Sequence, residues 1–254
     1  MPELPEVEAR RLTIEHACAN SVLLSLDIKK KGIVKHDDPG LRRRMTGETL
    51  LTVDRRGKYL ILGFADKILV TLHFGLFGDM AVAGAQETFP SVCARFVFDN
   101  RRALFLLKWA SVWFGTGVDA LEKLGPDPIA QPAKFTRDYF AGACSKKKTK
   151  IKQVLMDQAV IAGIGAVYAD EILFHAHILP GRPANSLEDD ESKRLYDAVR
   201  TTLKNAIEKT TARGDESRPF LSLEGRENCP VCGSRIVNTR LAGRRTLFCP
   251  HCQH

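Results

Sequence analysis

The feature that most constrains how this chain can fold lies in its last 26 residues, which hold two pairs of cysteines separated by sixteen residues. The four residues are Cys229, Cys232, Cys249 and Cys252. Within each pair two residues intervene, a spacing typical of a tetrahedral zinc site whose pairs are joined by a short hairpin. Four thiolates leave no open position for catalysis, so we expect one structural zinc ion. His251 and His254 are nearby alternative ligands.

The charge of the chain favours an anionic partner. The formal net charge is +8 and the sequence pI is about 9.2, a balance for which nucleic acid is the commonest partner. The segment between the cysteine pairs is itself rich in arginine, which indicates contact with phosphate. These arginines are Arg235, Arg240, Arg244 and Arg245.

The sequence does not predict a membrane protein or a secreted one. No apolar run approaches the length that spans a bilayer, and the acidic start of the chain, with Glu3, Glu6 and Glu8, lacks the layout of a signal peptide. We therefore expect a cytoplasmic protein of bacterial type, associated with the nucleoid.

The rest of the chain divides into a β-rich part and a helical part. Apolar residues at helical spacing predict a helix over residues 4–18. Short β-branched and aromatic runs between residues 22 and 114 predict about eight strands in an antiparallel sandwich or barrel. Residues 124–128, LGPDP, break any regular element, and the chain beyond them reads as helical. We expect an α+β multidomain protein with domains at residues 1–128, 129–220 and 221–254.

Residues 145–180 are a candidate DNA-contacting segment. A lysine-rich entry, an amphipathic stretch, the turn Gly163-Ile164-Gly165 and a helix from about Ala166 predict a helix-turn-helix unit. Glycine lets a phosphate approach the backbone of the turn, and the amides at the N-terminus of the next helix can bind it. A solvated charged surface is an equally good interpretation of the lysines.

The opening MPELPEVE places a proline directly after the initiator methionine. Removal of Met1 would leave the secondary amine of Pro2 as the chain terminus. An α-amino group titrates near ~8, so part of it is neutral at physiological pH and can attack a sugar aldehyde carbon. Glu3 lies beside this amine as a proton donor or acceptor. The alternative is a frayed terminus without a function.

Seven segments together resemble the formamidopyrimidine-DNA glycosylase and endonuclease VIII family, which repairs damaged bases. They occur in the family's order from one end of the chain to the other. They are MPELPEVE at 1–8, RRGKYLIL at 55–62, HFGLFGDM at 73–80, LGPDP at 124–128, KKKTKIKQVLMDQ at 146–158, GIGAVYADEILF at 163–174 and the four-cysteine segment. The chain resembles a divergent member of the family.

The resemblance implies an N-terminal helix and a catalytic β-sandwich, a helical domain with a helix-two-turn-helix motif, and a zinc ribbon. It implies a base-excision-repair DNA glycosylase with abasic-site lyase activity. In the family the N-terminal proline attacks C1′ of the damaged nucleotide, the base leaves, and a Schiff base forms. Successive β- and δ-elimination then cut the strand. Pro2 is the corresponding nucleophile here.

The resemblance also implies roles for individual residues. Glu3 assists ring opening and proton transfer, Lys58 contacts phosphate and helps catalysis, and Arg244 grips the phosphates beside the lesion as part of the catalytic set. Leu76 corresponds to an apolar wedge that fills the gap left by a flipped-out nucleotide. The other predicted DNA contacts are Glu6, His73, Lys152, Gly165 and Tyr168. Without the resemblance, Lys58 would be interpreted as an exposed turn lysine, Leu76 as core and Glu6 as a helix-end charge.

Three departures from the family pattern bear on specificity. The family's loop with two arginines and a phenylalanine, which reads the base opposite the lesion, is replaced by KWASVWFGTG at residues 108–117. Trp109, Trp113 or Phe114 could stack on bases there or belong to the core. The family's phosphate-binding asparagine is Ala166, and the linker over residues 212–228 is short. These departures favour lesions other than standard duplex 8-oxoguanine: oxidised pyrimidines, ring-opened or bulky adducts, abasic sites, or lesions in single strands.

Two other functions compete with this interpretation. One is a damage sensor of the same fold that binds damaged DNA without excising bases, and the altered recognition segments favour it. The other is a zinc-ribbon transcription factor, which explains the C-terminus but not the opening residues. We expect the partner to be damaged DNA, duplex or single-stranded, and the protein to be a monomer.

Overall fold

The computed structural model describes residues 1–116, 121–212 and 221–254, which form two compact units. The first contains Met1–Pro2 and Glu6–Glu122, and the second contains Glu3–Pro5 and Lys123–His254. The second unit therefore includes three residues from the start of the chain, and its four-cysteine segment belongs with the helices. Residues 213–220 of the short linker noted in the sequence lie outside the described residues. No helix in the described ranges is long and apolar enough to cross a membrane.

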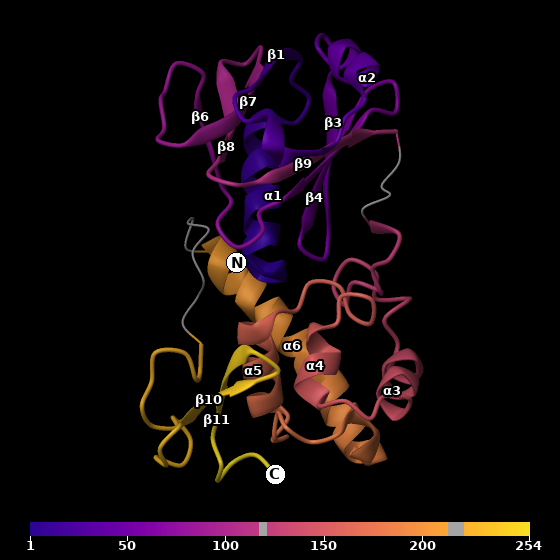
Figure 1. The fold of residues 1–254 in the computed structure, drawn as a ribbon, viewed down its shortest axis with the longest axis vertical. Coiled ribbons are helices and arrows are strands. Elements are labelled where there is room, and N and C mark those ends of the chain that lie inside the picture. The colour runs from indigo at the N-terminus through magenta and orange to yellow at the C-terminus, as the bar shows by residue number, and fades with distance from the viewer. Residues whose placement is uncertain (117–120, 213–220) are drawn as a thin grey trace. The chain divides into compact units, whose positions relative to one another are not determined.

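The described part of the first unit contains most of a long helix, two short helices and nine strands in two sheets (Figure 1). The helix α1 spans Leu4–Cys18, as predicted. The strands are β1 Leu23–Ile28, β2 Val34–His36, β3 Leu50–Arg56, β4 Tyr59–Phe64, β5 Leu69–His73, β6 Asp79–Gly84, β7 Val92–Phe98, β8 Arg102–Leu107 and β9 Ser111–Gly115. A 3-10 helix, Lys31–Ile33, precedes β2, and α2, Pro39–Arg44, follows it.

The two sheets share one hydrophobic core. Their strand orders are β1-β7-β8-β6 and β2-β9-β5-β4-β3. Side chains from α1 and from both sheets meet in this core, among them Val7, Leu62, Leu72 and Phe96. The predicted sandwich is thus confirmed, with one correction to its antiparallel character: β2 runs parallel to β9. This strand is only three residues long and reaches the sheet through the short 3-10 helix before it.

The second unit consists of helices and a β-hairpin. The elements are α3 Arg137–Ser145, α4 Ile151–Met156, α5 Ala166–His175, the 3-10 helix Ala184–Ser186, α6 Asp189–Ala212, and the antiparallel strands β10 Val237–Leu241 and β11 Arg244–Phe248. The predicted helix-turn-helix is present, because α5 begins at Ala166 directly after Gly165. On α6, Leu195, Val199 and Leu203 recur at one-turn spacing and are buried.

The stretch LGPDP packs closely although it has no regular structure. The Gly125 amide donates to the Gln158 carbonyl oxygen at 2.9 Å. Asp127 is fully buried, and its carboxylate accepts hydrogen bonds from the Ile129 and Ala130 amides at 2.9 and 2.8 Å. The described chain changes from the first unit to the second between Glu122 and Lys123, just before this stretch. Its backbone groups are therefore part of the helical packing.

Replacement of Gly125 by alanine is expected to destabilise the second unit. The added Cβ would lie 2.5 Å from the Val160 carbonyl oxygen and 2.6 Å from its carbonyl carbon, so the backbone must shift. We expect a loss of about 1–3 kcal/mol. Gly142→Ala is the matched control, because nothing lies within 4 Å of its Cβ in α3 and alanine favours a helix interior by about 1 kcal/mol. Thermal denaturation followed by circular dichroism should give a lower Tm for the first variant only; equal Tm values would contradict this packing.

Candidate functional site

The carboxylate of Glu3 lies at the N-terminus of α5. Glu3 is 3% exposed. Its carboxylate oxygens accept hydrogen bonds from the amides of Gly165, Val167 and Tyr168 at 2.5, 3.1 and 3.4 Å. The first amides of a helix have no partner within the helix, and the helix dipole adds positive potential there. Glu3 therefore supplies both the acceptors and the negative charge that this helix end requires.

The turn before α5 needs glycine at two positions, because the N-terminal residues pack too closely against it for a Cβ. A Cβ on Gly165 would lie 2.4 Å from the carboxylate carbon of Glu3. Gly163 has a φ of +108°, and a Cβ there would lie 2.6 Å from Leu4 Cδ1. The Leu4 amide also donates to the Gly163 carbonyl at 3.0 Å. The amides of Gly165, Val167 and Tyr168 donate to Glu3 in this structure, so the phosphate contact at Gly165 stays a prediction that this geometry does not favour.

Pro2, the predicted nucleophile, directly precedes the anchored Glu3. It is half-buried, and Met1 before it is 47% exposed. Glu6, a predicted DNA contact, is 4% exposed in the first turn of α1. Its burial there is consistent with the alternative interpretation as a helix-end charge. The attack by Pro2 and the DNA contact of Glu6 stay predictions.

Lys152 is buried in an ion pair within the second unit. Its ammonium lies 2.7 Å from Asp170 Oδ1, and it donates to the Arg245 carbonyl at 2.7 Å and to the Thr246 hydroxyl at 2.9 Å. The Leu247 amide donates to the other Asp170 oxygen at 2.9 Å. Lys152 and Asp170 thus connect α4 and α5 to β11 of the ribbon.

Burial changes the pKa values of both members of this pair. It lowers the pKa of Lys152, although the negative charge of Asp170 acts to raise it. It raises the pKa of Asp170 to about 6, against the attraction of Lys152. Lys152 is 1% exposed, so its ammonium has no surface to offer phosphate in this geometry. Tyr168, also predicted to contact DNA, is fully buried in the helical core. Both DNA contacts stay predictions that the geometry does not favour.

In the first unit, Lys58 and His73 interact electrostatically. Lys58 is 7% exposed and follows Gly57, whose φ of +59° forms the turn between β3 and β4. The His73 ring lies 4.6 Å from that of Tyr59, centroid to centroid. Burial, and then the positive charge of Lys58, lowers the pKa of His73 to about 4. His73 is therefore neutral at physiological pH, and its Nδ1 accepts a hydrogen bond from the Gly75 amide at 3.1 Å.

His73 orders the turn that carries the predicted wedge. Leu76 is 65% exposed, so it is not a core residue. Phe77 beside it is 69% exposed. Phe77 is a site residue that the sequence did not predict, although its place between the two glycines of HFGLFGDM is typical of an exposed loop tip. Of the three aromatic candidates, Trp109 is 61% exposed, whereas Trp113 is half-buried and Phe114 fully buried.

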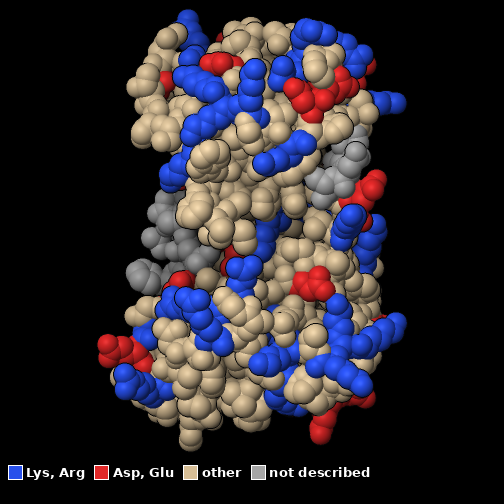
Figure 2. Space-filling view, in the orientation of Figure 1, with Lys and Arg blue, Asp and Glu red and all other residues tan. Residues whose placement is uncertain are grey.

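The ribbon arginines are exposed. Arg244 opens β11, where it pairs with Leu241 of β10, and its side chain is exposed. Arg235, Arg240 and Arg245 are exposed as well, and the Arg245 guanidinium lies 4.0 Å from the Glu224 carboxylate. In the view of Figure 2, each unit by itself shows more lysine and arginine than aspartate and glutamate side chains on its surface. The surface therefore offers cations to phosphate groups.

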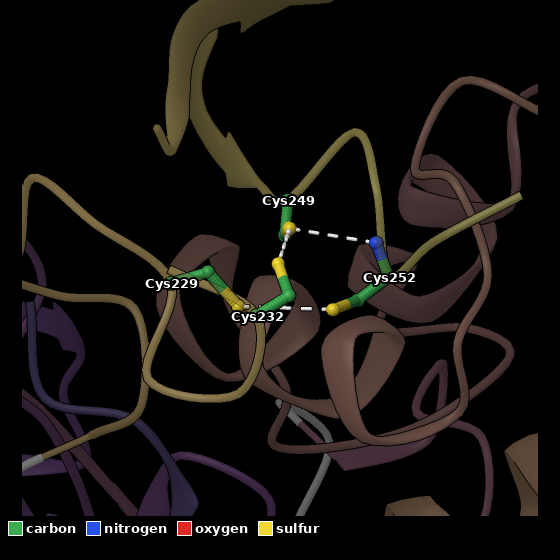
Figure 3. Close-up of side chains that lie close together, drawn as sticks. All are labelled: Cys229, Cys232, Cys249 and Cys252. Carbon is green, nitrogen blue, oxygen red and sulfur yellow. Dashed lines mark hydrogen bonds between the residues drawn. The ribbon is translucent and has the colours of Figure 1, made fainter. Parts of the chain in front are cut away.

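The four cysteine sulfurs converge at the base of the β10–β11 hairpin (Figure 3). All lie within 4.8 Å of one another. The Sγ atoms of Cys229 and Cys252 are 3.8 Å apart, and those of Cys232 and Cys249 are 3.5 Å apart. Zn–S bonds of about 2.3 Å place tetrahedral sulfurs about 3.8 Å from one another, so the cluster fits zinc. The predicted structural zinc site is confirmed in these four residues.

Three sequence families match successive parts of the chain. The formamidopyrimidine-DNA glycosylase N-terminal domain matches residues 1–107, the formamidopyrimidine-DNA glycosylase H2TH domain matches 124–216, and the zinc finger found in FPG and IleRS matches 226–254. Formamidopyrimidine-DNA glycosylases from Herpetosiphon aurantiacus and Heliobacterium modesticaldum are 36% and 33% identical, with 100% of each chain covered.

Solved structures agree with these sequence matches. Lactococcus lactis Fpg in complex with DNA that contains an abasic site has a TM-score of 0.90 and 28% identity, with 99% of each chain covered. The same values hold for its complex with DNA that contains an oxidised pyrimidine. Sandwich, helix-two-turn-helix and cysteine ribbon together define a DNA glycosylase of base excision repair. The chain belongs to the formamidopyrimidine-DNA glycosylase family.

His73→Gln is expected to weaken the dependence of stability on pH. The pKa of His73 is about 4 in the folded protein against an ordinary value of 6.5. Between these values the unfolded chain binds a proton that the folded chain does not, so stability falls as pH drops through this window. The loss is at most about 3 kcal/mol. Comparison of Tm at pH 7 and pH 5 should show a smaller drop in the variant than in the wild type.

The control for this measurement is His16→Gln. His16 is exposed on α1, and its replacement should leave the pH dependence of Tm unchanged. An unchanged pH dependence in His73→Gln, or an equal change in both variants, would contradict the proposed burial of neutral His73.

Proposed function

We propose that this chain is a bifunctional DNA glycosylase and abasic-site lyase whose nucleophile is the amine of Pro2. The observation that carries the proposal is the anchoring of Glu3 by three amides of α5. A frayed terminus is poorly ordered, whereas this carboxylate is buried and held by three hydrogen bonds. The anchored residue directly follows Pro2, so the amine released by removal of Met1 is attached to a fixed point in the protein.

The chemistry proceeds from the lone pair of the Pro2 nitrogen. This pair forms a bond to C1′ of the damaged nucleotide, the glycosidic bond breaks, and its electron pair leaves with the base, which takes up a proton. The nitrogen, now bonded to C1′, loses its N–H proton, and opening of the sugar ring with protonation of O4′ then gives the iminium (Schiff base). Loss of a proton from C2′ expels the 3′ phosphate, and a second elimination expels the 5′ phosphate. Glu3 transfers protons in these steps.

The remaining predicted residues serve phosphate binding and base extrusion. Lys58 and Arg244 contact the phosphates on either side of the lesion, and Leu76 fills the gap that the extruded nucleotide leaves. The exposure of Arg244 and Leu76 supports these roles. Lys58 is largely buried, so its contact with phosphate requires the DNA to approach the turn after β3 closely.

The substrate range of this enzyme differs from that of a glycosylase that recognises 8-oxoguanine opposite cytosine in duplex DNA. The segment that carries two arginines in the family contains none here, and Val112 and Phe114 in β9 are buried. We propose oxidised pyrimidines, ring-opened or bulky adducts, abasic sites and lesions in single strands as substrates. The same absence favours the second candidate function, a damage sensor without base excision.

Borohydride trapping on an oligonucleotide with one abasic site tests the proposal. Borohydride reduces the iminium to a stable amine, so the N-terminally processed protein should become covalently attached to DNA through Pro2. Pro2→Gly should lose most of the adduct, and Glu3→Gln should form it at least tenfold more slowly, because a neutral amide is a poor proton acceptor. Peptide mapping by mass spectrometry locates the bond.

The matched control is Glu122→Gln, which removes an exposed charge at the end of the first unit and should trap as the wild type does. Absence of adduct and of strand cleavage in the wild type, together with tight binding to the same DNA, would contradict the enzyme and support the sensor. An adduct that maps elsewhere than Pro2 would contradict the assigned nucleophile.

A further inference from the structure

Two neighbouring connections of the first unit expose large apolar side chains. Leu76 and Phe77, on the connection from β5 to β6, are 65% and 69% exposed, and Trp109, on the connection from β8 to β9, is 61% exposed. A tryptophan and a phenylalanine that are this exposed do not contribute the free energy that their burial would provide. A cluster of such residues on a surface therefore indicates a binding site.

The pairing of the strands brings the two connections together. Both connections run between the same two sheets. The strands at the two ends of one connection pair with the strands at the two ends of the other: His73 of β5 pairs with Ser111 of β9, and Asp79 of β6 pairs with Leu107 of β8. Between these pairs Gly78 packs on Ala110 so closely that a Cβ on the glycine would lie 2.9 Å from Ala110 Cα. Phe77 and Trp109 are each one residue from this contact, so their side chains start from neighbouring points of the backbone.

The backbone holds both aromatic residues in place. The Gly78 amide donates to the Phe74 carbonyl at 2.6 Å and closes the turn that exposes Phe77. Phe74 itself is buried, with the Arg10 guanidinium 4.3 Å from its ring centroid. Lys108 has a φ of +62°, a conformation that costs free energy in a residue other than glycine, and it directly precedes Trp109. The exposed positions are thus fixed by the local structure.

The charges around Trp109 favour a polyanion as the occupant. The Lys30 ammonium lies 4.7 Å from the centroid of the indole, and Lys29 and Lys31 flank it in the sequence. The Lys108 side chain is 55% exposed, and its ammonium lies 3.3 Å from the Asp79 carboxylate. Aromatic rings beside cations are the combination with which proteins bind single-stranded nucleic acid, because bases stack on the rings while phosphates meet the cations.

We propose that Phe77 and Trp109 form a stacking platform for unpaired bases of the DNA substrate, with Lys30 and Lys108 beside it for the phosphates. The inference rests on the proposed function and defines its substrate class: damaged DNA with unpaired nucleotides near the lesion, as in a single strand or a bubble. Both faces of a paired base are already covered by its neighbours in the duplex, so the platform contributes binding free energy only where bases are unpaired.

The experiment compares binding of two DNA probes by fluorescence anisotropy. The probes are a single-stranded oligonucleotide with one tetrahydrofuran abasic analogue and the same oligonucleotide annealed to its complement, in which every nucleotide except the one opposite the analogue is paired. Trp109→Ala and Phe77→Ala should each weaken binding to the single strand by about 5- to 150-fold and change binding to the duplex less than about twofold. Trp109→Phe, which keeps an aromatic ring, should restore most of the single-strand affinity.

The matched control is Leu51→Ala, which removes another exposed apolar side chain of this unit, 53% exposed on β3. It should bind both probes as the wild type does. Unchanged single-strand affinity in Trp109→Ala and Phe77→Ala, or equal losses on both probes, would overturn the platform. A concentration-dependent dimer in sedimentation that Trp109→Ala abolishes would also overturn it, because the surface would then bind a second copy of the chain.

Borohydride trapping of the same proteins separates this inference from the proposed function. If the wild type is trapped on the abasic site and Trp109→Ala binds the single strand with normal affinity, the lyase is supported and only the platform is refuted. If the wild type is neither trapped nor able to cleave, but Trp109→Ala binds the single strand more weakly than the wild type does, the enzyme is refuted. The platform would then be the binding surface of a sensor.

Discussion

The interaction on which the rest of the site depends is the set of hydrogen bonds between the Glu3 carboxylate and the first amides of α5. A buried carboxylate is costly unless hydrogen bonds compensate for lost hydration, and charge-assisted bonds to backbone amides do so. Three amides bond to Glu3. The proline that directly precedes Glu3 in the sequence is therefore attached to a residue that cannot move freely.

This interaction explains two sequence features that are otherwise unrelated. The turn Gly163-Ile164-Gly165 was predicted from the sequence to admit a phosphate. In the structure its glycines admit the N-terminal residues instead, Gly163 beside Leu4 and Gly165 beside Glu3. A chemical requirement at one end of the chain thus dictates residue types about 160 positions away. In the same way the buried pair of Lys152 and Asp170 joins the helices to the ribbon hairpin that carries Arg244.

Local patterns in the sequence predicted the elements well. Cysteine spacing predicted the zinc cluster, helical periodicity predicted the bounds of α1, and short β-branched runs predicted the sandwich. What local patterns cannot show is the partner of a polar side chain when that partner is distant in the sequence. The resemblance implied that Lys152 contacts phosphate, and only the fold reveals that this lysine is buried beside Asp170. The parallel pairing of β2 was missed for the same reason, since β9 lies far along the chain.

The amide proton of Gly165, observed in an NMR spectrum of the isotope-labelled protein, reports directly on the hydrogen bond to Glu3. A short bond to a carboxylate should shift this proton strongly downfield and protect it from exchange with solvent. Glu3→Ala should move it upfield by more than one part per million and abolish the protection, while the amide of Gly142 in α3 stays unchanged. A Gly165 resonance that is the same in both proteins would show that Glu3 does not occupy the end of α5, and the central claim would be wrong.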